Sequence, residues 1–158
     1  MWVRPTSYLV GGKIVLPCRP EFSTKGHVVD VNALVALGLR HHEFHFRVAR
    51  WLQEKQFPPV ATCSITELGF IRVLAQASAY GLSVADARTL LLRLKKSHHL
   101  PFTFITDDQD VSHLPASVTT SRQTTDGHLV QLARRHDAVL ATLDGGIRGA
   151  YLVPERRT

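Results

Sequence analysis

The sequence has few of the residues that mark several classes of protein. Its two cysteines, Cys18 and Cys63, are too few and too far apart for a disulfide framework or a zinc site. No apolar run approaches the ~20 residues that a membrane-spanning helix needs. With 10 Gly, 8 Pro and 44% hydrophobic residues, the chain is neither collagen-like nor of low complexity. We therefore expect an ordinary globular core, no membrane association and a reducing, cytoplasmic location.

Acidic residues are scarce relative to basic ones. The chain has 158 residues, with 19 Lys and Arg against 13 Asp and Glu, and a formal net charge of +6. Its isoelectric point is about 9.8. Such a charge favours an acidic partner, and nucleic acid is the leading candidate.

Residues 1–26 differ from the rest of the chain. They mix prolines and glycines with short apolar pieces, sustain no helical or strand period, and carry four basic residues against one acid. They also lack the apolar run of about 7–15 residues that a secretory signal needs. We expect residues 1–26 to be an irregular N-terminal extension or an upstream start that precedes the true domain. Residues 27–158 are then expected to form one domain.

From His27 onward the pattern alternates between strands and helices. Short apolar, β-branched runs predict strands over residues 27–31, 59–63, 102–105 and 138–143. Helical periodicity predicts helices over residues 32–57, with a His-rich break, and over 64–81, 83–96 and 121–136. Ser64 and Glu67 have the spacing of a capping box. The alternation predicts an α/β fold around a central, mostly parallel sheet of four to five strands.

Four acidic residues lie at the ends of these elements: Asp30, Glu67, Asp126 and Asp144. Asp30 lies within an apolar strand, near its end, and Asp144 follows another strand directly. Ligands bind beyond the carboxyl ends of parallel strands, so the two carboxylates would face one crevice if their strands are neighbours. A cluster of carboxylates without Lys or Arg needs divalent cations, and oxygen ligands select Mg²⁺ or Mn²⁺. The chemistry that such a site serves best is hydrolysis of a phosphodiester.

Each acid also has a purely structural interpretation. Glu67 suits a capping box, Asp126 suits the first turn of a helix, and Asp144 before two glycines suits a turn. Asp30 is harder to explain, because an unpaired acid is costly in an apolar strand. The joint placement of the four acids, rather than any single one, favours a functional site. Four basic residues of the helix over 83–96 are expected to form a solvated face or to contact phosphates: Arg88, Arg93, Lys95 and Lys96.

The sequence resembles the PIN-domain family, and within it the VapC-type ribonuclease toxins of bacterial toxin–antitoxin pairs. The resemblance runs from about His27 to the C-terminus. It rests on four segments in the order of the family, Val29-Asp-Val-Asn-Ala-Leu34, Thr62-Cys-Ser-Ile-Thr-Glu-Leu-Gly-Phe-Ile-Arg-Val73, Ser121-Arg-Gln-Thr-Thr-Asp126 and Leu140-Ala-Thr-Leu-Asp144. The family's first acid normally lies within a few residues of the N-terminus. Its place here at residue 30 supports the interpretation of residues 1–26 as an appendage.

The resemblance implies a PIN-like three-layer α/β/α sandwich whose metal ligands and catalytic residues are Asp30, Glu67, Asp126 and Asp144. Asn32 and Thr142 match polar positions that support the site, where they would orient carboxylates. Arg122 is a candidate substrate contact because it lies one helical turn from Asp126.

The function that the resemblance implies is a Mg²⁺-dependent (or Mn²⁺-dependent) endoribonuclease that hydrolyses phosphodiesters with metal-activated water. The chain would be the toxin of a type II toxin–antitoxin system, with RNA as substrate, a small antitoxin protein as inhibitor and a homodimer as its assembly. Two alternatives stay open. One is a housekeeping PIN nuclease for RNA processing or for DNA, and the other is a non-catalytic module that binds nucleic acid or protein. Four mutually repelling acids argue against the non-catalytic module.

Overall fold

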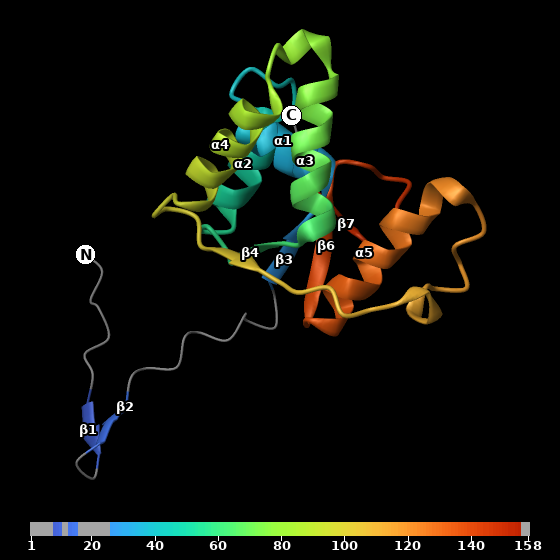
Figure 1. Ribbon diagram of the computed structural model, residues 1–158. Helices are drawn as coiled ribbons and strands as arrows, with labels where there is room; N and C mark the ends of the chain where they lie inside the picture. The colour runs from blue at the N-terminus through green and yellow to red at the C-terminus, as the bar shows by residue number, and fades with distance from the viewer. Residues whose placement is uncertain (1–7, 11–12, 16–25, 156–158) are drawn as a thin grey trace.

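The computed structural model describes residues 8–10, 13–15 and 26–155. In this part of the chain a parallel sheet has the strand order β5-β4-β3-β6-β7 (Figure 1). Its strands are β3 (Gly26–Val29), β4 (Val60–Thr62), β5 (Phe102–Phe104), β6 (Ala138–Thr142) and β7 (Tyr151–Leu152). Every neighbouring pair in this sheet is parallel. The expectation of a mostly parallel sheet of four to five strands is therefore confirmed.

Helices cover both faces of the sheet, as Figure 1 shows. On one side lie α1 (Val31–Gly38), α2 (His45–Glu54), α3 (Ser64–Gln76) and α4 (Val84–Lys95). On the other side lies α5 (Thr124–Arg135), which packs against β6 and β3. The result is the three-layer α/β/α sandwich that the resemblance implies.

The two faces of β3 explain why its consecutive residues Val28 and Val29 are both apolar. Side chains alternate across a strand. Val28 packs into a buried cluster with Leu129 and Leu132 of α5, whereas Val29 packs into a second cluster with Leu34 and other residues of the α1–α4 side. Because helices bury both faces, the strand has no solvent-facing position that would favour a polar residue. The sheet therefore lies between two hydrophobic cores.

Several boundaries differ from the sequence expectations. Asp30 does not lie within the strand: β3 ends at Val29, and Asp30 is the N-cap of α1. Glu67 is not part of a capping box either, because Cys63 is the N-cap of α3 and the side chain of Thr66 closes the box. The cap lies one residue earlier than predicted, which moves Glu67 from the third helical position to the fourth.

The His-rich break expected within residues 32–57 is confirmed, whereas two other helices are interrupted where a single helix was expected. Residues 32–57 form two helices, α1 and α2, separated by turns over the His-rich segment. The helix expected over 64–81 ends at Gln76, and a short 3₁₀ helix, η1 (Ser78–Tyr80), follows it. The helix expected from Ser121 starts with the 3₁₀ helix η3 (Ser121–Gln123) before α5. The last strand, β7, is two residues long, which is too short for a periodic signal.

The expected N-terminal extension is described only in part. Within it, β1 (Tyr8–Val10) and β2 (Lys13–Val15) pair as antiparallel strands, with Tyr8 opposite Val15. Residues 1–7, 11–12 and 16–25 lie outside the described residues, so the irregular extension and its boundary with the domain stay predictions. Among the described residues, no helix is long and apolar enough to cross a membrane.

Candidate active site

Two of the predicted acids meet because β3 and β6 are neighbours. The two strands pair in parallel, with Val29 opposite Ala141, so their carboxyl ends lie at the same edge of the sheet. The backbone N–H of Asp30 continues this pairing by donating to the carbonyl of Ala141 (2.9 Å). Asp30, directly after β3, therefore lies beside the segment that carries Asp144, although 114 positions separate them in the sequence.

The side chain of Asp30 is held on both of its oxygens. Oδ1 accepts the backbone N–H of Val31 at 2.7 Å, which caps α1, and Oδ2 accepts the hydroxyl of Thr142 at 2.7 Å. The residue is only 6% exposed. A buried carboxylate needs such donors, because its burial without them is costly. The cap and the hydroxyl therefore hold the carboxylate in one orientation at the strand end.

Thr142 connects the end of β6 to the start of α1. Its hydroxyl oxygen accepts the side-chain amide of Asn32 at 3.1 Å and the backbone N–H of Asp144 at 3.1 Å. The oxygen of the Asn32 amide in turn accepts the backbone N–H of Leu143 at 3.0 Å. Thr142 is fully buried. The two polar residues singled out by the resemblance thus bond to Asp30 or to the backbone around Asp144.

A tight turn after β6 positions Asp144. The backbone N–H of Gly146 donates to Oδ1 of Asp144 at 2.7 Å. A Cβ at position 146 would lie 3.1 Å from that same oxygen, which is closer than most real Cβ contacts. A residue without a side chain therefore suits this turn. Asp126 approaches from the other layer, in the first turn of α5.

The three aspartates influence one another electrostatically. Burial raises the pKa of Asp30, its hydrogen bonds from Thr142 and Val31 lower it, and the negative charge of Asp144 raises it; the net direction is upward. The pKa of Asp126 is also raised, by burial first and then by the charges of Asp30 and Asp144. Ionisation of Asp30 and Asp126 is therefore disfavoured, and a bound cation would relieve the repulsion.

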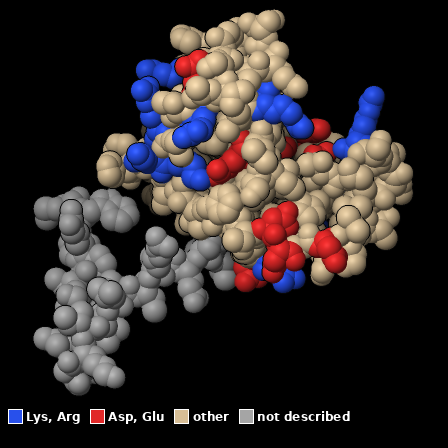
Figure 2. Space-filling view, viewed as in Figure 1, with Lys and Arg blue, Asp and Glu red and all other residues tan. Residues whose placement is uncertain are grey.

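All three aspartates line one open hollow of about 740 Å³. Asn32 and Arg72 line it as well, beside apolar side chains of α1, α3 and α5: Val35, Val73 and Leu129. Figure 2 shows acidic and basic side chains close together beside α3, on the side that faces α5. The hollow is large enough to admit part of a nucleotide chain, and its charge is of mixed sign.

Glu67 lies elsewhere. Its Oε1 accepts the hydroxyl of Thr62 at 2.6 Å and forms an ion pair with the ammonium group of Lys95, which also lies over the ring of Phe104. Glu67 is not among the residues that line the hollow. The structure thus brings together three of the four predicted acids. Lys95 was expected on a solvated or phosphate-binding face, and no feature of the sequence pattern indicated that it pairs with Glu67.

The donor chemistry of the hollow fits a hard cation. Its acidic side chains are carboxylates, two of which have raised pKa values, and oxygen ligands of this kind suit Mg²⁺ or Mn²⁺. In the described part of the chain, no three His, Cys, Asp or Glu side chains are close enough to form a ready-made metal site. Binding would therefore require the carboxylates of Asp30, Asp126 and Asp144 to turn toward a common point.

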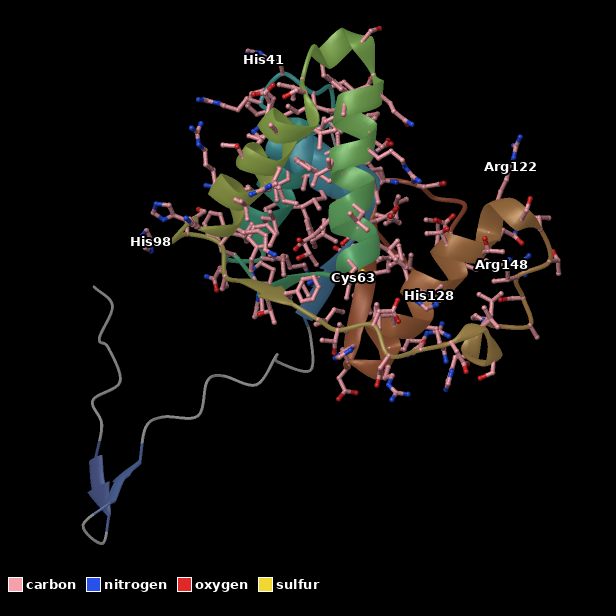
Figure 3. The ribbon with its side chains drawn as sticks, viewed as in Figure 1. His41, Cys63, His98, Arg122, His128 and Arg148 are labelled. Atoms are coloured by element: carbon pink, nitrogen blue, oxygen red, sulfur yellow. The ribbon has the colours of Figure 1, made fainter. Side chains whose placement is uncertain are left out.

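Arg122 borders the acids from a second, smaller hollow of about 200 Å³. Asp126 and Asp144 line this hollow too, together with Arg148 from the segment after β6. His128, two residues after Asp126, bonds instead to Asp107 (Nε2 to Oδ2, 2.6 Å) and lines neither hollow. Figure 3 shows Arg122, Arg148 and His128 on the α5 side of the molecule.

The PIN domain family model matches residues 27–151. The chain belongs to the PIN-domain family. Ribonuclease VapC38 of Mycobacterium tuberculosis is 37% identical over 126 residues, which cover 76% of this chain and 86% of that protein. Ribonuclease VapC29 of the same species is 36% identical over 122 residues, with the same coverage of both chains. These relatives place this PIN domain in the VapC group, which confirms the resemblance found in the sequence.

Solved structures agree on the fold of this PIN domain. The crystal structure of PAE2754 from Pyrobaculum aerophilum has a TM-score of 0.56 at 20% identity, covering 85% of this chain and 88% of that chain. The crystal structure of Mycobacterium tuberculosis VapC20, described as a toxin that cleaves the sarcin-ricin loop, has a TM-score of 0.54 at 16% identity. It covers 77% of this chain and 92% of that chain. At such identities the likeness supports the α/β/α sandwich and no finer property.

Proposed function

We propose that this PIN domain is a ribonuclease that hydrolyses RNA phosphodiesters at the hollow lined by Asp30, Asp126 and Asp144. The observation that carries the proposal is the meeting of three carboxylates from distant segments at one sheet edge, where α/β proteins bind ligands. The named ribonucleases among its relatives support RNA as the substrate. The net charge of +6 is suited to attracting a phosphate backbone.

Asp30, Asp126 and Asp144 are the residues that would hold Mg²⁺ or Mn²⁺. When bound, such a cation supplies charge neutralisation and makes water a better nucleophile at neutral pH. Glu67 is the fourth ligand that the resemblance predicts, and it would have to leave Lys95 to take part. Thr142 and Asn32 contribute by holding the Asp30 carboxylate and the backbone of Leu143 and Asp144 in place.

We further infer that the protein is the toxin of a type II toxin–antitoxin pair. The VapC relatives support this role, and the resemblance implies a small cognate antitoxin as the inhibitor. A cytoplasmic location and a homodimer remain parts of the same proposal. Induced expression tests it: growth arrest by the parent chain, and its absence with Asp30→Asn, would support the toxin. Normal growth with the active parent chain would favour a housekeeping nuclease.

The activity is tested with Asp30→Asn and purified RNA in Mg²⁺ or Mn²⁺. Asparagine caps a helix as well as aspartate does, so the fold should persist while the charge is lost. We expect cleavage to fall at least 100-fold, the scale of losing a group that stabilises the transition state. Asp110→Asn is a matched control, because Asp110 is also an N-cap aspartate but lies outside the hollow. If the folded Asp30→Asn variant cuts RNA as fast as Asp110→Asn, the assignment of the site is wrong.

A further inference from the structure

The smaller hollow beside the acids places two arginines opposite two aspartates. Arg122 reaches it from η3 and Arg148 from the segment after β6, whereas Asp126 and Asp144 are shared with the larger hollow. The two hollows therefore adjoin at these acids. A chain molecule that occupies the acidic hollow has a basic space directly next to it.

Neither arginine is used by the fold. Among the described residues, no ion pair or side-chain hydrogen bond involves Arg122 or Arg148, and both are exposed. Two other arginines are held by the fold: Arg47 pairs with Glu155 and bonds to the carbonyl of Val153, and Arg135 pairs with Asp108. Two guanidinium groups beside a carboxylate cluster, yet paired with neither carboxylate, remain available for a ligand.

The chemistry of the pair suits a phosphodiester. A guanidinium group presents several N–H donors in a planar fork that matches phosphate oxygens, and its charge cannot be lost at physiological pH. Apart from these two arginines and the two aspartates, the lining residues are uncharged, with Gln123, Gly127 and Ile147 among them. Asp126 and Asp144 line the same hollow, so the two guanidinium charges become available to a phosphate once a cation neutralises these carboxylates.

We propose that Arg122 and Arg148 form a subsite for the phosphodiester next to the scissile one in single-stranded RNA. The inference rests on the proposed function, because it assumes that the scissile phosphate lies at Asp30, Asp126 and Asp144. Contacts of this kind position a strand but read no bases, so the subsite contributes affinity and register rather than sequence preference.

Binding is measured by fluorescence anisotropy with a labelled single-stranded RNA of about 12 nucleotides, a length within the range of single-strand binding sites. All proteins carry Asp30→Asn so that the probe is not cut. We expect R122Q/R148Q to bind about tenfold more weakly, and the salt dependence of its affinity to fall by about 0.7 for each lost phosphate contact. The matched control is R88Q in α4, an exposed arginine that lines neither hollow.

A second arm locates the phosphate. After the cut site of the parent enzyme is mapped, each phosphate that flanks it is replaced in turn by a neutral methylphosphonate. We expect one flanking replacement to raise KM about tenfold for the parent and to have little effect on R122Q/R148Q, because the partner is already missing. Mn²⁺ affinity, measured by calorimetry, should be the same in both proteins.

Three results would overturn the inference. The first is that R122Q/R148Q binds the probe as tightly as R88Q, and the second is that the arginine and methylphosphonate changes have additive effects on KM. The third is a loss of Mn²⁺ affinity in R122Q/R148Q. The last would mean that the arginines support the acids rather than the RNA. These results leave the proposed function standing, provided that Asp30→Asn abolishes cleavage. An inactive parent chain would instead refute the proposed function, and the binding arm would still decide whether the arginines hold RNA.

Discussion

Thr142→Val removes the hydroxyl at the centre of the candidate site and keeps a side chain of similar shape. The hydroxyl is fully buried, donates to Asp30 and accepts from Asn32 and from the backbone of Asp144. A hydrogen bond to a charged group contributes about 1.5–3 kcal/mol, and a buried donor left unpaired costs about 1–3 kcal/mol. Asp144 is exposed, so water can satisfy its N–H. We therefore expect a loss of about 2–4 kcal/mol in the free energy of unfolding.

Urea denaturation followed by circular dichroism, with EDTA present, measures this loss. Thr142→Ser keeps the hydroxyl and loses one methyl group, which should cost only about 1 kcal/mol. Thr89→Val is the exposed control: its hydroxyl bonds only to the helix carbonyl of Ala85, and the change should stay within about 0.5 kcal/mol. If Thr142→Ser is the more damaging change, packing of the methyl group matters more than the hydroxyl network, and the reasoning fails.

Three further predictions concern charge. Burial and the charge of Lys55 lower the pKa of His27, so the unfolded chain takes up a proton at a higher pH than the folded chain does. The urea midpoint should therefore fall as the pH drops below about 6.5, and this fall should be smaller in His27→Phe. An unchanged slope in His27→Phe would refute this. The raised pKa of Asp30 has the opposite sign: its contribution to stability is present below about pH 3.9 and lost as the pH rises through its folded pKa. Without metal at pH 7, Asp30→Asn should therefore raise the urea midpoint. Asp110→Asn should lower it, because hydrogen bonds from Ser112 lower the pKa of Asp110. A lower urea midpoint for Asp30→Asn would contradict this prediction. Finally, Lys95→Met frees Glu67, and calorimetry should show Mn²⁺ affinity rising several-fold, as expected when a competing cation is removed. Unchanged affinity would mean that Glu67 takes no part in metal binding.

The presence and order of the strands and most helices were predictable because they depend on local chemistry, although several of their boundaries were not. Apolar runs such as Val28-Val29 predict a strand buried on both faces, and the structure confirms this. The placement of Asp30 and Asp144 at strand ends follows from the same pattern. The exact cap of α3 was not predictable: Cys63 and Ser64 are adjacent, and the bond from the Cys63 N–H to Thr66 decides between them.

The partners of the acids were less predictable, because each depends on contacts between distant segments. Glu67 was expected beside the aspartates, but Lys95 lies 28 residues further along the chain and meets it only because α4 packs against α3. Arg148 follows a strand in a segment with no periodic signal, and its place beside Arg122 results from the turn at Asp144. Sequence spacing carries no information on such pairs.

By itself, the sequence determined the alternation of strands and helices, the family, and which acids end which elements. These properties depend on periodicity and on short motifs, whose physical basis is local: the faces that a strand or helix buries and the groups that cap it. The tertiary structure alone decided that β3 lies beside β6, that three aspartates share one hollow, and that Glu67 pairs with Lys95. Strand order and helix packing are set by burial of whole surfaces, and only that packing brings residues more than a hundred positions apart into contact.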